Sequence, residues 1–415
     1  MLKNKEESEK CEKSGKKIFR LAVIASHPIQ YQCPFFRELA KCSEVDLKVL
    51  FCSDWGLKSY NDPGFGQEIK WDIPLLDGYN FEFLPNKSPF PNVSRFWGLF
   101  NPQIVKKIKE GNFDAVWVHG WASLTNLLAI LSAFAFNIPV LIRGESNLLQ
   151  PTNPLKNYIK ENILKTLFKN VSAFLAIGRY NSEFYEMHGV SKEKVYLVPY
   201  TVDNDFFFFK AKEFLPKKTE LKTKFGIPFD IPVILFSGKL IDVKRPMDLL
   251  KAYADVSKGL KAALIFVGDG LLRKKLETFA RENQLQHVYF MGFRNQSELP
   301  EFYAMADIFV LPSGSEPWGL VVNEAMCFGL PVIVSDQVGA SGDLVKDGEN
   351  GFVYPSMNIN LLAEKLKMLL DNKDLMDKMG KNSKEIIMKW SYKEDINGLK
   401  KALIAINKKQ TVRLE

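Results

Sequence analysis

Cysteine and histidine are scarce in this chain of 415 residues, which contains five of the first and four of the second. An odd number of cysteines without paired spacing excludes a disulfide framework and favours a reducing compartment. Neither residue type shows the spacing of metal ligands, so we expect no metal and no cofactor. The cysteines are Cys11, Cys33, Cys42, Cys52 and Cys327.

The chain also lacks a long apolar run. The longest one, from Leu127 to Ile142, is interrupted by Asn137 and Pro139 and is too short to cross a bilayer. Residues 1–17 mix lysines with glutamates and contain no apolar core of a secretory signal, so they predict a disordered charged tail. These features favour a cytoplasmic protein that is at most peripheral on the cytoplasmic face of a membrane.

Basic residues outnumber acidic ones, and the net charge of +8 favours anionic partners. Nucleic acid is not an expected partner, because no helix-turn-helix and no aromatic–basic recognition motif is visible. Phosphorylated small molecules and anionic lipid headgroups fit the charge better. A hydrophobic content of 46% with 25% charged residues is typical of a globular protein, and the length predicts two domains.

Short apolar runs alternate with helix-like segments along the chain. Runs that are apolar on both faces predict strands buried between helix layers, in parallel sheets. The sequence therefore predicts an α/β protein of two Rossmann-like, doubly wound domains that face a cleft, with ligands beyond the carboxyl ends of the strands. The expected strands are 19–26, 46–52, 115–120, 139–144, 173–178 and 195–200, then 233–238, 263–268, 288–292, 308–312 and 331–336. We place the domains at 18–202 and 203–389, followed by a helix and tail at 390–415.

The second half carries a set of motifs suited to a nucleotide diphosphate-sugar. A helix is expected to begin near Gly319, and its free N–H groups would attract the diphosphate. Lys239 and Lys244 follow an expected strand and supply cations for the leaving group. Glu316 precedes the helix, and Glu324 lies ~7–8 Å along its axis at 1.5 Å per residue. This is roughly the reach from a pyrophosphate to a ribose diol.

These motifs resemble those of the group 1 retaining glycosyltransferases (glycosyltransferase family 4), which have the GT-B fold. The resemblance is specific over residues 231–352 and looser over the first domain. It implies transfer of a sugar, most simply a hexose, from a UDP- or GDP-sugar to an acceptor hydroxyl, with retention and without a metal. It also implies a role in cell-surface polysaccharide or glycolipid biosynthesis, and a C-terminal helix that crosses back to the first domain. A catalytically inactive partner subunit and a nucleotide-sugar epimerase on the same scaffold are the alternatives.

The same resemblance assigns roles to single residues. Glu316 would contact the donor sugar and Glu324 the ribose, while Lys239 stands where the family has an arginine. Arg245 is then a candidate for the bidentate guanidinium contact that a lysine at position 239 cannot make. The expected catalytic residues are Glu316 and His119. The other donor-binding candidates are Lys244, Phe293, Arg294, Trp318, Gly319 and Leu320, and the acceptor-side candidates are His27, Arg143 and Glu145.

Two further patterns resemble known motifs without fitting them. Asp203-Asn204-Asp205 has the form of a metal-binding Asp-x-Asp, but it lies at the expected domain boundary and is interpreted as a turn and helix cap. Gly268-Asp269-Gly270 has Arg273 where a dinucleotide fingerprint needs its third glycine. It therefore predicts a tight turn, and not an NAD site.

A helical stripe between residues 155 and 168 has two interpretations. It predicts either a helix packed on the core or a surface that docks on an anionic membrane carrying a lipid-linked acceptor. The stripe comprises Leu155, Tyr158, Ile159, Ile163, Leu167 and Phe168, its other faces carry Lys156, Lys160, Lys165 and Lys169, and the connector adds Phe206–Phe209 with Lys210 and Lys212.

Overall fold

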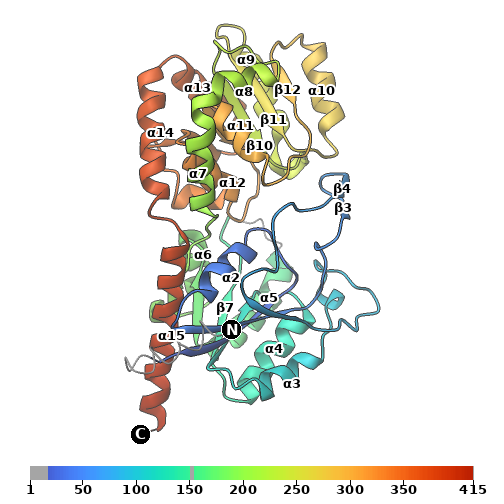
Figure 1. The fold of residues 1–415 in the computed structure, drawn as a ribbon, viewed down its shortest axis with the longest axis vertical. Helices are drawn as coiled ribbons and strands as arrows, with labels where there is room; N and C mark the ends of the chain where they lie inside the picture. Colours follow the sequence, from blue (N-terminus) through green and yellow to red (C-terminus); the bar gives the residue numbers. More distant parts are fainter. Residues whose placement is uncertain (1–16, 150–153, 415) are drawn as a thin grey trace.

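The computed structural model of the chain describes residues 17–149 and 154–414, and these form two α/β domains stacked along the long axis (Figure 1). The expected tail therefore lies outside the described residues, except for Lys17. Each domain is a parallel sheet covered by helices on both faces, as the apolar runs predicted.

The first domain contains a seven-stranded parallel sheet in the order β5-β2-β1-β6-β7-β8-β9. Its strands are β1 (Phe19–Ala25), β2 (Val45–Phe51), β5 (Asn80–Phe83), β6 (Ala115–His119), β7 (Val140–Arg143), β8 (Ala173–Ala176) and β9 (Val195–Leu197). Its helices are α2 (Cys33–Ala40), α3 (Gln103–Glu110), α4 (Leu124–Ala135), α5 (Pro154–Lys169) and α6 (Arg179–Met187). In β1, Leu21 and Val23 enter one buried cluster and Ala22 and Ile24 another, because successive side chains point to opposite faces of the sheet.

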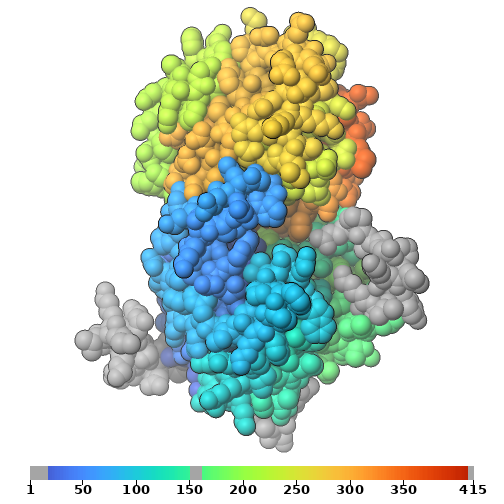
Figure 2. All heavy atoms as spheres, turned by 90° about the vertical axis from the view of Figure 1, so that its right-hand side faces the viewer, coloured from blue at the N-terminus to red at the C-terminus, as the bar shows by residue number. Residues whose placement is uncertain are grey.

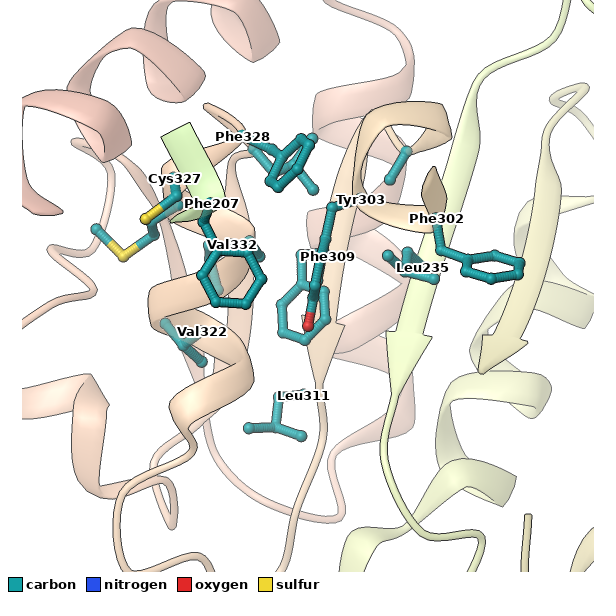
Figure 3. Packing of buried hydrophobic residues seen from close by; sticks show 14 of the residues in the cluster. Phe207, Leu235, Phe302, Tyr303, Phe309, Leu311, Val322, Cys327, Phe328 and Val332 are labelled. Atoms are coloured by element: carbon teal, nitrogen blue, oxygen red, sulfur yellow. The ribbon is translucent and has the colours of Figure 1, made fainter. Parts of the chain in front are cut away.

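The second domain contains a six-stranded parallel sheet in the order β12-β11-β10-β13-β14-β15. Its strands are β10 (Val233–Ser237), β11 (Ala263–Val267), β12 (Val288–Phe290), β13 (Ile308–Leu311), β14 (Val332–Ser335) and β15 (Gly351–Tyr354). Its helices are α7 (Asn204–Phe214), α8 (Lys218–Lys224), α9 (Pro246–Val256), α10 (Arg273–Glu282), α11 (Leu299–Met305), α12 (Leu320–Cys327), α13 (Ile359–Leu370) and α14 (Lys373–Ile387). Figure 3 shows the core between sheet and helices, where the Tyr303 ring lies beside Phe309 and Phe328.

Two chain crossings join the domains and are bonded to each other. The first lies between β9 and α7, and the second between α14 and α15 (Tyr392–Leu414). The Asn204 amide donates to the carbonyls of Ile387 and Trp390, each at 3.1 Å, and the Trp390 indole donates to Tyr200 O at 2.8 Å. Helix α15 then packs on β8, β9 and α2, so it crosses back to the first domain as expected.

A hairpin that the sequence reading missed forms a third contact between the domains. Strands β3 (Tyr60–Asp62) and β4 (Gln67–Ile69) pair antiparallel, apart from the main sheet. The hairpin rises from the first domain toward the second in Figure 1, and in Figure 2 this blue segment meets the gold atoms of the second domain. It lies on the side of the molecule away from α14 and α15.

The expected membrane-facing elements are only partly exposed. In α5, Ile163 of the predicted stripe is 61% exposed, whereas Leu164 and Phe168 are buried, so the residues after position 160 do not form the predicted face. The side chains of Leu155, Tyr158 and Ile159 lie outside the described residues. In the connector, Phe207 is buried in the second-domain core and only Phe209 is well exposed. Over the described parts of the chain, no helix combines the length and the apolarity that crossing a bilayer requires.

Candidate functional site

A cavity of about 790 Å³ lies between the two domains, within the size range of small-molecule sites. From the second domain it is lined by the loops at the carboxyl ends of β10, β11, β12 and β13, which is where a doubly wound sheet binds its ligands. From the first domain it is lined by the segment after β1 and by the β3–β4 hairpin with its flanks. The predicted site residues that line it are His27, Lys239, Lys244, Phe293, Arg294, Glu316, Gly319, Leu320 and Glu324.

Glu316 and Lys244 form an ion pair at the wall of this cavity. The backbone of Glu316 is held on both sides, because its N–H donates to Gln337 O and its carbonyl accepts from Gly339, each at 3.0 Å. Lys244 ends a short 3₁₀ turn after β10, Asp242–Lys244. A carboxylate and an ammonium are thus fixed side by side, facing the same space.

Gly319 begins helix α12 in a conformation that favours glycine. Its φ is +95°, and a Cβ placed there would lie 2.8 Å from Leu311 Cδ2. Leu320, the first residue of the helix, also lines the cavity, so the free N–H groups of the first turn adjoin the ion pair. The helix start that the sequence predicted near Gly319 is confirmed.

Glu324 lies one turn farther along α12 and is buried. Its Oε2 accepts from the Tyr303 hydroxyl at 2.6 Å, and its Oε1 accepts from Gln296 Nε2 at 3.4 Å. Burial raises the pKa of Glu324 to about 7, and the two hydrogen bonds oppose this rise. Near neutral pH the group is therefore present in both protonation states, each of which can hydrogen-bond to a diol.

Lys239 lies at the carboxyl end of β10 and is already paired with a carboxylate from the other domain. Its Nζ is 2.8 Å from Asp62 Oδ1 and 3.0 Å from Asp62 Oδ2, and it lies 4.9 Å from the ring centre of Phe65. Asp62 is the last residue of β3. No pattern that we used in the sequence indicated this contact.

Phe293 and Arg294 occupy the loop after β12. The Phe293 ring packs edge-on against Phe65 at 4.9 Å and Trp71 at 6.1 Å, both from the hairpin region. Arg294 lines the cavity, while its guanidinium bonds to Glu298 and to its own loop. The cavity end near this loop is therefore aromatic.

Two donor-site candidates do not line the cavity. Trp318 does not line the cavity; it is buried, stacks on Trp390 with ring centres 5.6 Å apart, and donates its indole N–H to Asn323. Arg245 is not part of the cavity lining, and its guanidinium pairs with Asp248. Trp318 instead packs beside the domain crossings, because its indole stacks on Trp390.

His119, expected to be catalytic, does not line the main cavity either. It lies in a separate cavity of about 10 Å³, too small for a sugar, and its ring stacks on Trp117 at 4.8 Å. Burial, and then the charge of Arg143, lower the pKa of His119 to about 3, so the imidazole is neutral. The residue ends β6 as predicted, but the pleat directs its side chain onto the same face as Trp117, away from the main cavity. The geometry does not support a catalytic role.

Arg143 is a structural cation and not an acceptor-side group. Its side chain is buried, donates to the carbonyls of Val198 and Pro199 at 3.1 and 2.8 Å, and lies 3.6 Å from Asp395 of α15. Burial raises the pKa of Asp395 to about 6, against the lowering effect of Arg143. The pair ties the crossover helix to the first sheet.

The remaining acceptor-side candidates take different positions. His27 lines the cavity, and its ring lies edge-on to Trp55 at 4.9 Å; burial lowers the pKa of His27 to about 4. Glu145 is exposed outside the cavity lining and accepts from the hydroxyls of Tyr31 and Tyr200.

The first domain supplies cavity residues that the sequence reading did not identify. They are aromatic or charged groups from the hairpin and its flanks: Trp55, Tyr60, Asp62, Phe65 and Trp71. A signal was present, because Asp62-Pro63-Gly64-Phe65-Gly66 is turn chemistry between two short runs. Its position between two domains was not readable from that signal.

The Asp203-Asn204-Asp205 segment is a helix cap, as predicted. Asp203 is the N-cap of α7, and its side chain accepts from Phe206 N at 2.9 Å. Asn204 bonds across to the second chain crossing. Within residues 17–149 and 154–414, no three His, Cys, Asp or Glu side chains gather as a metal site would need.

A family model described as glycosyl transferases group 1 matches residues 217–386. Residues 217–386, which make up most of the second domain, are therefore similar to the group 1 glycosyltransferases. Glu316, Glu324, Lys239 and Lys244, which line the cavity, all fall within the matched segment. The resemblance read from the sequence motifs is confirmed.

Several proteins named as glycosyltransferases match parts of the chain. Uncharacterized glycosyltransferase MJ1178 of Methanocaldococcus jannaschii is 35% identical over 167 residues, which is 40% of this chain and 46% of that protein. A Campylobacter jejuni N-acetyl-D-galactosaminyltransferase, named for an undecaprenol-linked glycan, is 26% identical over 77% of this chain and 80% of its own length. For the first curated relatives matched, the chain spans about half of their length.

Solved structures show the same fold over nearly the whole chain. Anabaena Alr3699/HepE in complex with UDP has a TM-score of 0.68 at 18% identity, and the match covers 95% of this chain and 99% of that one. The predicted GT-B fold is therefore confirmed, and at this identity the likeness concerns the fold alone.

Proposed function

We propose that this protein is a retaining glycosyltransferase that moves a sugar, most simply a hexose, from a UDP- or GDP-sugar to an acceptor hydroxyl. One observation carries the proposal: two lysines, the start of α12 and two glutamates all adjoin a single cavity between the domains. These groups are what a diphosphate, a sugar and a ribose need for recognition. The relatives named as glycosyltransferases support the same reaction class.

The roles of the residues follow from their positions. Lys239, Lys244 and the α12 N-terminus would neutralise the diphosphate as the glycosidic bond breaks, a task that needs no metal. Glu316 would accept from hydroxyls of the donor sugar, and Glu324 from the ribose. Retention would arise if the acceptor attacks on the face from which the diphosphate departs, with a phosphate oxygen taking the acceptor proton.

Product analysis separates transfer from its alternatives. We expect purified protein to hydrolyse one UDP- or GDP-sugar slowly without acceptor, as measured by mass spectrometry of the released nucleotide. Excess EDTA should leave the rate unchanged, since lysines and the helix start carry the charge. Loss of the rate under EDTA, restored by Mg²⁺ or Mn²⁺, would contradict metal independence. Formation of an epimerised sugar nucleotide would indicate an epimerase. The absence of any reaction with every donor tested would indicate an inactive partner subunit.

For the acceptor we propose a lipid-linked glycan at the cytoplasmic face of an anionic membrane, in cell-surface polysaccharide or glycolipid assembly. The surface that supports this is a loop in the first domain, where Phe90 is 75% exposed and Trp97 is 69% exposed. Hydrogen bonds hold the loop rigid, for example Ser88 Oγ to Trp97 O at 2.7 Å. Residues 83–109 contain no carboxylate and five cations, Lys87, Arg95, Lys106, Lys107 and Lys109, of which Lys106 and Lys107 pair with the flanking Glu110 and Glu82. Exposed aromatics among cations are typical of interfacial anchors.

Replacing Phe90 and Trp97 together by serine should reduce co-sedimentation with phosphatidylglycerol vesicles by about tenfold or more, because burying one such side chain contributes roughly 1.5–3 kcal/mol. Phe229 is 68% exposed on the second domain, so Phe229→Ser is the matched control and should bind as wild type does. Raising the salt concentration should weaken wild-type binding. If wild-type protein does not bind these vesicles at low salt, the proposed docking on an anionic membrane is excluded.

A further inference from the structure

The β3–β4 hairpin contacts the donor half of the cavity at several points. The Asn295 amide donates to Lys70 O at 2.7 Å, and the Ser297 backbone N–H donates to Asp72 at 3.3 Å. At the turn, a Cβ on Gly64 would lie 2.6 Å from Lys239 Cδ, so the hairpin backbone rests directly on this lysine. The hairpin is thus seated on the second domain.

The contact that matters chemically is the one between Asp62 and Lys239. Both carboxylate oxygens lie within 3.0 Å of the ammonium, so the positive charge proposed for the diphosphate is already neutralised. Asp62 is well buried and part of a turn, because its Oδ1 also accepts from Gly64 N at 2.8 Å and Phe65 N at 3.1 Å. A diphosphate that reached Lys239 with Asp62 in place would meet a like charge at close range.

The hairpin also covers the loop expected to meet the nucleobase. Phe65 and Trp71 pack on Phe293, whose ring edge they occupy. One element of the first domain therefore engages both donor-binding features, the diphosphate cation and the base loop. A donor and the seated hairpin compete for the same groups.

We propose that the hairpin is an internal occupant of the donor site, in which Asp62 holds Lys239 until the donor diphosphate displaces it. The proposal rests on the donor role assigned to Lys239 above. Donor entry then requires the hairpin to release Lys239. Apparent donor affinity falls by the fraction of molecules in which the site is free, so a hairpin seated in roughly 90% of them lowers affinity about tenfold.

Asp62→Asn tests this with little change of shape, since the amide oxygen keeps the bonds from Gly64 and Phe65. Pyrophosphate is the probe, because it carries the charge without the base, and binding is measured by calorimetry. The variant should bind pyrophosphate about five- to tenfold more tightly than wild type. Asp72→Asn is the matched control. It removes a carboxylate next to the hairpin that is in none of the ion pairs of the described residues, its amide oxygen can still accept from Ser297, and binding should stay within about twofold of wild type.

A double-mutant cycle with Lys239→Gln tests whether the effect of Asp62→Asn on pyrophosphate affinity acts through Lys239. The gain from Asp62→Asn should vanish in the Lys239→Gln background, and Asp62→Ser serves if the asparagine variant melts early. Equal or weaker pyrophosphate binding by the folded Asp62 variants overturns the proposal, as does the absence of binding by both wild type and variants at millimolar pyrophosphate. The pyrophosphate assay does not depend on sugar transfer. If the variants show the predicted order of pyrophosphate affinities but the protein transfers sugar from no donor, this proposal is supported and the proposed function is contradicted.

Discussion

Replacing Glu316 by glutamine is expected to lower sugar transfer by about a hundredfold or more, while the protein remains folded. The carboxylate faces the cavity beside Lys244, and its backbone is fixed by bonds to Gln337 and Gly339. Glutamine keeps the volume but removes the charge that would polarise donor-sugar hydroxyls as the glycosidic bond breaks. Because that interaction strengthens in the transition state, the loss should appear in kcat more than in KM for the donor.

Glu301→Gln is the matched control for this experiment. Glu301 is also paired with a lysine, Lys224, in the same domain, but it does not line the cavity. It should transfer sugar at the wild-type rate. Turnover of Glu316→Gln within about threefold of wild type would contradict the assignment of the active site.

Replacing Arg143 by methionine should lower the free energy of unfolding by about 3–5 kcal/mol, because it leaves the buried Asp395 without its cation. The arginine also lies over the ring of Tyr200, at 4.9 Å from its centre. The deficit should be larger at pH 8 than at pH 5. Asp395 already has a folded-state pKa of about 6, above its unfolded value, and loss of Arg143 raises it further. Stability is then lost as pH rises and the buried group must ionise.

The double variant Arg143→Met with Asp395→Asn should recover much of this loss, since neither charge is then buried alone. Denaturant unfolding of the wild type, both single variants and the double variant measures the coupling. An unchanged unfolding free energy in Arg143→Met, together with a raised acceptor KM, would restore the acceptor-side role that the sequence suggested.

Much of the fold could be predicted because parallel strands buried on both faces are continuous apolar runs. Every strand expected from such a run is present. Two sheet strands were missed for local reasons. β5 alternates polar and apolar residues at the sheet edge, and β15 begins with Gly351, whose missing side chain lets it lie against Val332.

The second-domain lining of the cavity could be predicted because its residues come from consecutive loops at one sheet edge. The first-domain side could not, because side-chain direction there depends on contacts between distant segments. Arg143 ends a strand, as catalytic residues often do, but its partner Asp395 lies on the last helix. Asp62 meets Lys239 only once both domains are placed. A turn motif indicates a hairpin and not the surface on which the hairpin rests.

The crossover helix has a consequence for how the chain folds during synthesis. Leu399, Leu403 and Ile406 of α15 belong to the same buried cluster as Leu21 and Leu47, near the start of the chain. One face of the first sheet, which α2 covers in part, therefore stays incompletely covered until α15 leaves the ribosome, whereas the second domain has all of its sheet strands by residue 354. The half that is translated first is the half that is completed last.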